Sequence, residues 1–132
     1  MPSGGEPAGG GGARPSTSAR GRAGEALVAS ALEAEGWILL ARNFRAGRGE
    51  IDLVAARGDT LAFVEVKSWR SLGSGDLGDS IGGDKRRRIV ETAKIFLVRN
   101  RQYRYLRARF DVALVRGGEI VRRIESAFTG DL

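Results

Sequence analysis

The residues of this chain with the clearest chemical potential are two acids and a lysine, Asp52, Glu65 and Lys67. Two apolar runs flank a Gly-Asp turn at residues 58–59, a pattern typical of a β-hairpin with a two-residue loop. Counting back from that turn puts Asp52 opposite Glu65, and Lys67 points to the same face because side chains alternate along a strand. Opposed carboxylates destabilise a sheet, so the pattern predicts a divalent cation that offsets their repulsion.

The chemistry that such a site could perform is hydrolysis of a phosphate ester. Two carboxylates can hold one Mg²⁺ ion, which keeps most of its waters and accepts a phosphate oxygen. A bound metal lowers the pKa of a coordinated water, and Lys67 could orient that water or neutralise the developing negative charge. The alternative is that these residues form ordinary ion pairs on a sheet face, Glu50 with Lys67 and Asp52 with a nearby arginine.

Composition narrows both the metal and the partner. The chain has 132 residues, which allows one domain. It contains no Cys and no His, so a catalytic metal must sit on oxygen ligands, which suits Mg²⁺, Mn²⁺ or Ca²⁺. With 22 basic and 16 acidic residues and a net charge of +6, the chain favours polyanionic partners, above all nucleic acid.

No apolar run approaches the roughly 18 residues of a membrane span, and the N-terminus lacks a signal-peptide core, which predicts a cytoplasmic protein with no membrane partner.

The elements that must position these residues follow from periodicity and from glycine-rich breaks. Residues 1–18 are rich in Gly, Pro and Ser and predict a disordered tail, so the folded domain is assigned to residues 19–132. A helix, three strands, a long loop, a helix capped by Asp84 and two strands are predicted at residues 20–35, 37–44, 49–57, 60–67, 68–83, 84–99, 109–116 and 119–124. This order predicts an α/β fold, a mixed central sheet of about five strands flanked by helices.

Charged residues on the two predicted helices are further candidates. Glu25 lies at the border of the buried stripe of the first helix, where it is either solvated or, if the helix packs over the carboxylate face, part of the site. Lys85 begins the second helix and is equally well explained as a phosphate contact or a surface charge. Arg86, Arg87 and Arg88 follow it, either as a solvated basic face or as a nucleic-acid contact. Four cations at a helix N-terminus oppose the macrodipole, and a bound anion would reverse that effect.

Three residues of the last third have structural as well as functional interpretations. Tyr103 and Tyr105 lie among arginines and could stack nucleic-acid bases, but covering a helix end is the preferred interpretation. Asp111 lies within an apolar strand. We predict that it is structural and pairs with Arg109 or with a loop amide.

Five segments of the chain form an ordered set of motifs. They are Gly21-Arg22-x-Gly24-Glu25, Gly49-Glu50-Ile51-Asp52-Leu53, Phe63-Val64-Glu65-Val66-Lys67, Lys85 and Arg109-Phe110-Asp111-Val112. This set resembles the YraN family, uncharacterised proteins with a predicted endonuclease-like domain, over nearly all of residues 20–128. Through that family the chain is similar to the PD-(D/E)XK restriction-endonuclease-like fold, and within it to the archaeal Holliday-junction resolvases.

The resemblance implies a mixed sheet flanked by helices, with a metal site at the hairpin. It implies that Asp52 and Glu65 are metal ligands and that Lys67 is the catalytic lysine. Glu25 would match the helix acid that completes the site in such nucleases, and Lys85 matches a basic position often found after the loop.

Together, the residues and the resemblance predict a metal-dependent endonuclease that hydrolyses phosphodiester bonds in DNA, with branched or damaged DNA as candidate substrates. The cofactor would be Mg²⁺, with Mn²⁺ as an alternative. The expected catalytic set is Glu25, Asp52, Glu65 and Lys67, and the expected nucleic-acid contacts are Lys85, Arg86, Arg87 and Arg88. An enzyme that cuts junctions would act as a symmetric homodimer, because two strands must be cut.

Two other functions are compatible with the same sequence. One is a nucleic-acid-binding module that keeps the nuclease fold but does not cut. The other is an assembly protein whose basic face meets an acidic partner protein. Metal-dependent strand scission would distinguish the endonuclease from both of these functions. Salt-sensitive DNA binding would distinguish the binding module from the assembly protein.

Overall fold

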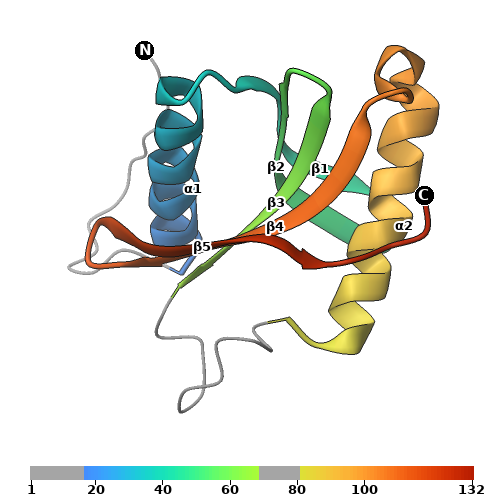
Figure 1. Ribbon diagram of the computed structural model, residues 1–132. Coiled ribbons are helices and arrows are strands. Elements are labelled where there is room, and N and C mark those ends of the chain that lie inside the picture. The colour runs from blue at the N-terminus through green and yellow to red at the C-terminus, as the bar shows by residue number, and fades with distance from the viewer. Residues whose placement is uncertain (1–16, 69–80) are drawn as a thin grey trace.

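One mixed β-sheet with a helix on each face makes up the computed structural model, which describes residues 17–68 and 81–132 (Figure 1). The elements are, in chain order, α1 (Thr17–Ala34), β1 (Ile38–Ala46), β2 (Gly49–Arg57), β3 (Thr60–Ser68), α2 (Gly83–Arg99), the 3-10 helix η3 (Arg101–Tyr103), β4 (Arg107–Arg116) and β5 (Glu119–Phe128). Neither α-helix of this described part is both long and apolar enough to span a membrane.

The predicted fold class is confirmed. The strands are ordered β1-β2-β3-β4-β5 across the sheet. Every neighbouring pair is antiparallel except β3 and β4, which run parallel. A parallel pair needs a crossover connection, and here α2 lies in that connection and packs back on the sheet.

The predicted boundaries are less accurate than the fold class. Helix α1 begins at Thr17, inside the segment predicted as a tail, while residues 1–16 of that tail lie outside the described residues. Residues 69–80 of the predicted long loop also lie outside them. Helix α2 has Gly82 rather than Asp84 as its N-cap, and no side chain caps it. Asp84 instead lies in the first turn, where it pairs with Arg87.

The register of the β2–β3 hairpin follows the prediction near its turn and departs from it at the other end. Arg57 pairs with Thr60 and Val54 with Phe63, as predicted, but the ladder stops at Leu53 and Val64. Just beyond this point, the Asp52 carboxylate accepts the backbone N–H of Val66 at 2.8 Å. A side chain thus takes a bond that a strand carbonyl would otherwise accept, which separates the strands where the acids lie.

Two apolar cores hold the helices on opposite faces of the sheet. Helix α2 covers a core with aromatic rings, in which Phe96 meets Phe63 edge-on with ring centroids 5.9 Å apart. Helix α1 covers a second core built on Val28 and Leu32 and closed by Trp37. Both helices are therefore fixed by burial of apolar surface, which brings residues distant in sequence to the same sheet.

Gly49, the first residue of β2, lets the turn between β1 and β2 lie directly on α2. A Cβ there would be 2.8 Å from the carbonyl oxygen of Arg88 and 2.5 Å from the hydroxyl of Thr92. That hydroxyl shares its one proton between the carbonyls of Ala46 at 3.2 Å and Arg88 at 2.8 Å, joining the turn to the helix. Only glycine fits this approach, because the obstructing atoms include helix backbone.

We predict that Gly49→Ala lowers the free energy of unfolding by about 1–3 kcal/mol, the usual effect of overpacking a rigid contact. Gly21→Ala is the matched control, because a Cβ at that exposed helical position meets no atom within 4 Å. The control should be neutral or stabilising by up to about 1 kcal/mol, since alanine favours helix more than glycine. Denaturant unfolding followed by circular dichroism measures both. Equal stabilities for the two variants would contradict the close contact.

Candidate functional site

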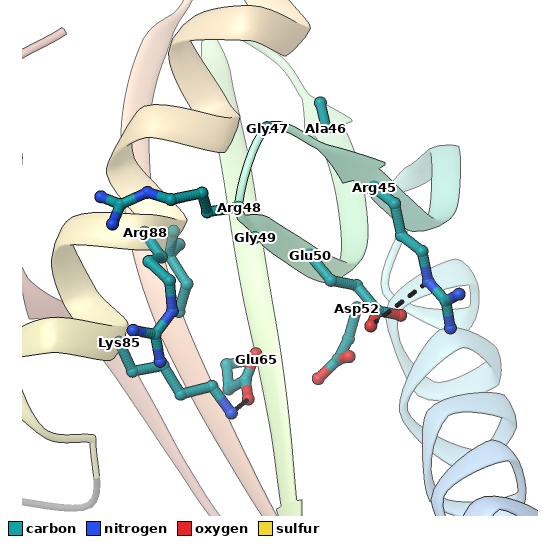
Figure 2. Close-up of a pocket in the computed structure, with 11 residues that line it drawn as sticks. Arg45, Ala46, Gly47, Arg48, Gly49, Glu50, Asp52, Glu65, Lys85 and Arg88 are labelled. Carbon is teal, nitrogen blue, oxygen red and sulfur yellow. Dashed lines mark ion pairs between the residues drawn. The ribbon is translucent and has the colours of Figure 1, made fainter.

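A cleft of about 540 Å³ lies between the β1–β2 turn and the first half of α2. Its lining includes four cations and three acids (Figure 2). They are Arg45, Arg48, Lys85, Arg88, Glu50, Asp52 and Glu65. The two acids predicted as metal ligands, Asp52 and Glu65, thus share one cleft with two of the predicted nucleic-acid contacts, Lys85 and Arg88.

Asp52 is held at the end of the β2–β3 ladder by its bond to the Val66 amide. The neighbouring strand is distorted at the same level. Arg42 and Phe44 of β1 pair with the residues on either side of Asp52, and Asn43 between them has a positive φ of 52°. Asparagine tolerates this left-handed conformation better than most residues. The backbone on both sides is therefore shaped around this half-buried carboxylate.

Glu65 is the buried acid of the cleft, with 7% of its side chain exposed. The amine of Lys85 lies 2.6 Å from its Oε2 atom. Burial raises the pKa of Glu65 from 4.5 to about 7; the negative charge of Asp52 acts in the same direction, and Lys85 lowers the value only in part. The protein therefore keeps the mutually repelling carboxylates of Asp52 and Glu65 in a partly desolvated part of the cleft.

Glu25 lies beside Asp52 because α1 packs very closely on the sheet. A Cβ at Gly24 would be 3.1 Å from a methyl carbon of Val115, so the absence of a side chain there lets the helix approach. Burial raises the pKa of Glu25 to about 7; the charge of Asp52 raises it further, and a hydrogen bond with Asn43 lowers it. The helix does pack over the carboxylates, the condition on which the sequence interpretation of Glu25 depended.

The carboxylates do not form a preassembled cage. In residues 17–68 and 81–132, no group of three or more His, Cys, Asp or Glu side chains is arranged to hold a metal ion. Glu25 does not line the cleft that contains Asp52 and Glu65. The site therefore offers the carboxylates of Asp52 and Glu65 inside the cleft, with Glu25 next to Asp52 but outside the cleft lining.

The two candidate lysines differ in position. Lys67 does not line the cleft, and no ion pair joins it to another residue of the described part. Lys85, from α2, is the amine in contact with Glu65. The catalytic role of Lys67, which lies in β3, stays a prediction. The amine that contacts the buried Glu65 belongs to Lys85 of α2.

The basic run at the start of α2 divides among three environments. Arg86 donates to the carbonyl of Ile81 at 2.8 Å and lies over the ring of Phe128. Arg87 pairs with Asp84. Arg88 alone of the three lines the cleft. The sequence could not predict which of these three arginines lines the cleft, because their positions depend on how α2 is rotated against the sheet.

The sequence did not assign two arginines of the cleft to the site, Arg45 near the end of β1 and Arg48 in the β1–β2 turn. Arg45 pairs with Glu50 at 3.5 Å, so Glu50 has a different partner from Lys67, the one that the ion-pair alternative gave it. Arg48 pairs with Glu91 of α2 at 3.3 Å. The glycine-containing basic turn was the available signal, but only the contact of Gly49 with α2 places it at the cleft.

The remaining candidates are mainly structural. Asp111 accepts bonds from Arg109 at 2.9 Å, as predicted, and from the backbone N–H of Ser126 at 2.9 Å, which belongs to β5 rather than to a loop. Tyr103 stacks on Phe96 with centroids 6.3 Å apart and so covers the end of α2. Tyr105 does not share that role, because it is 79% exposed.

The described fold and site define the class of this protein: an α/β domain with a mixed five-stranded sheet and a cleft in which carboxylates lie among cations. A family model, described as uncharacterised protein family UPF0102, matches residues 24–115. The chain belongs to this family, which is the YraN family indicated by its motifs.

Relatives from distant bacteria match most of the chain. A UPF0102 protein of Treponema pallidum (strain Nichols) is 44% identical over 103 residues, 78% of this chain and 82% of its own length. One from Mesorhizobium japonicum is 44% identical over 111 residues, 84% and 87% of the two chains. One from Desulfosudis oleivorans is 40% identical over 113 residues, 85% and 91%. These names state no activity, so the function must be argued from the site.

We predict that the metal-free protein loses stability as pH rises from about 4.5 to about 7. In this window the folded protein retains a proton on Glu65 that the unfolded chain has released, and stability falls where the folded state binds more protons. Glu65→Gln should raise the free energy of unfolding at pH 8 by about 1–3 kcal/mol. Thermal unfolding across pH measures this, with the exposed Glu33→Gln as control. Stability that increases through the window would contradict the crowded carboxylates.

Proposed function

We propose that this protein is a metal-dependent endonuclease that hydrolyses phosphodiester bonds in DNA. The observation that carries the proposal is that Asp52 and the buried Glu65 line one cleft together with four cations. Burying like charges together opposes folding, so a protein that keeps two such acids side by side is expected to use them. Branched or damaged DNA is the substrate class to test first, with the protein acting in the cytoplasm as a symmetric dimer.

The donor set fits a hard divalent cation such as Mg²⁺ or Mn²⁺. Asp52 uses one oxygen for the Val66 amide, which leaves its other oxygen as a ligand. Glu65 supplies the second carboxylate, and Mg²⁺ commonly binds through one or two carboxylates while keeping several waters. A cation held there would activate a water and stabilise negative charge on the phosphate. Glu25 adds negative charge beside Asp52, which strengthens the attraction for a cation.

The cations of the cleft supply the affinity for the nucleic-acid backbone. Arg45 lies near the end of β1 and Arg48 in the turn after it, and Arg88 and Lys85 lie on the facing helix (Figure 2). A guanidinium can bind two phosphate oxygens at once. Arg88 makes no ion pair within the described part of the chain, so its charge is available to a phosphate. The net charge of +6 favours the same partner.

A non-catalytic nucleic-acid-binding module is the second candidate, and one contact favours it. The amine of Lys85 already neutralises Glu65 at 2.6 Å, so the cleft could bind a phosphate backbone without a metal. This alternative predicts salt-dependent DNA binding without strand scission.

We predict that Asp52→Asn and Glu65→Gln each reduce cleavage of DNA by about 10²-fold or more, because each removes a charged ligand of the catalytic cation. The assay is purified protein on fluorescent branched DNA with Mg²⁺ or Mn²⁺. Glu119→Gln, at the exposed first residue of β5, is the matched control. Since Glu65→Gln is expected to stabilise the fold, lost cleavage cannot be attributed to unfolding. Equal cleavage by wild type and Glu65→Gln would refute a catalytic role for this site.

We predict that Arg88→Ala weakens DNA binding about three- to tenfold and lowers the slope of log affinity against log salt by about 1, the effect of losing one phosphate contact. Fluorescence anisotropy without divalent cations separates this binding from cutting. Arg122→Ala removes the same charge from the exposed face of β5 and should have little effect. If both variants lose affinity equally, the DNA is not held in the cleft.

A further inference from the structure

Lys85 occupies an unusual position for a helix cation. It lies in the first turn of α2, which begins at Gly83, where the helix dipole disfavours positive charge. Its amine nevertheless lies 2.6 Å from Glu65 Oε2. The interaction with a buried carboxylate therefore offsets an unfavourable placement, and the amine fills a cation position inside the cleft.

The other ion pairs of the cleft differ from this one. Arg45 pairs with Glu50 and Arg48 pairs with Glu91, whose side chains are 35% and 53% exposed. Exposed pairs of this kind contribute little and exchange easily with water and salt. The Glu65 side chain is only 7% exposed. Removing its partner without replacement leaves a buried charge unpaired, which is strongly unfavourable.

We propose that Lys85 is a tethered cation that competes with the divalent metal for Glu65 and, once displaced, binds a phosphate of the nucleic acid. This inference rests on the proposed function. Lysine carries its charge on a flexible four-carbon stem, and the Lys85 side chain is 40% exposed, so the amine can leave Glu65 for the open cleft. Arg88 lies three residues later on the same helix and lines the same cleft, so one backbone can meet both side chains.

This arrangement makes the binding of metal and nucleic acid mutually reinforcing. A phosphate that holds the Lys85 amine leaves Glu65 without a cation, which favours the metal. A metal on Glu65 frees Lys85 for the phosphate. Because such coupling is reciprocal, each ligand must raise the affinity for the other by the same factor.

The test is Mn²⁺ binding, followed by the electron paramagnetic resonance of the free ion, for wild type, Lys85→Met and Arg88→Met. Methionine keeps an apolar stem and removes the charge. Without DNA, Lys85→Met should bind Mn²⁺ about tenfold more tightly, whereas Arg88→Met, which removes a cleft charge that does not touch Glu65, should change affinity less than about threefold. A nuclease-resistant phosphorothioate DNA should strengthen Mn²⁺ binding by wild type but not by Lys85→Met. Lys85→Gln repeats the measurement with a polar side chain.

The outcomes separate this inference from the proposed function. If wild type binds Mn²⁺ and the Lys85 variants bind it equally or more weakly, competition by Lys85 is refuted while the metal site stands. If Arg88→Met tightens binding as much as Lys85→Met, the effect is the general field of the cleft and the inference also fails. If only the Lys85 variants bind Mn²⁺, Lys85 blocks the site as proposed. If no form binds Mn²⁺, both the metal site and the inference are refuted.

Discussion

Repulsion between two carboxylates at the end of one β-ladder is the constraint around which this structure is organised. Asp52 and Glu65 lie where the pairing of β2 with β3 stops, and the charge of Asp52 helps to raise the pKa of Glu65. Several features accommodate the repulsion: the Val66 amide holds Asp52, the Lys85 amine holds Glu65, and β1 is distorted beside Asp52. A site that needed only stability would not retain such a pair.

Two glycines connect that constraint to the rest of the fold. Gly24 lets α1 approach the sheet, which brings Glu25 beside Asp52. Gly49 lets the β1–β2 turn touch α2, which forms the cleft and puts Lys85 within reach of Glu65. Both are sites where a single methyl group would meet other atoms of the protein. The apolar cores hold the helices on the sheet, and the glycines determine how near they come.

Much of the fold could be predicted from sequence, and the errors share a cause. The Gly-Asp turn predicted the pairing of Arg57 with Thr60 correctly, because a two-residue loop leaves little freedom in register. Strand ends were less accurate: β5 continues to Phe128, although its last residues alternate poorly. Its continuation is stabilised from elsewhere, since Phe128 stacks on Phe110 and the Ser126 amide bonds to Asp111. Local pattern predicts an element, whereas distant partners determine where it ends.

The amino-acid sequence by itself determined the types of chemistry available: oxygen ligands without Cys or His, a positive net charge, and two acids on adjacent strands. Those conclusions depend on composition and on the two-residue period of a strand, which are properties of the covalent chain. Only the tertiary structure decided that Lys85 contacts Glu65, that Arg88 lines the cleft while Arg86 and Arg87 do not, and that Glu25 stands behind Asp52. These outcomes depend on the rotation and depth of two helices on a sheet, which many distant contacts determine together.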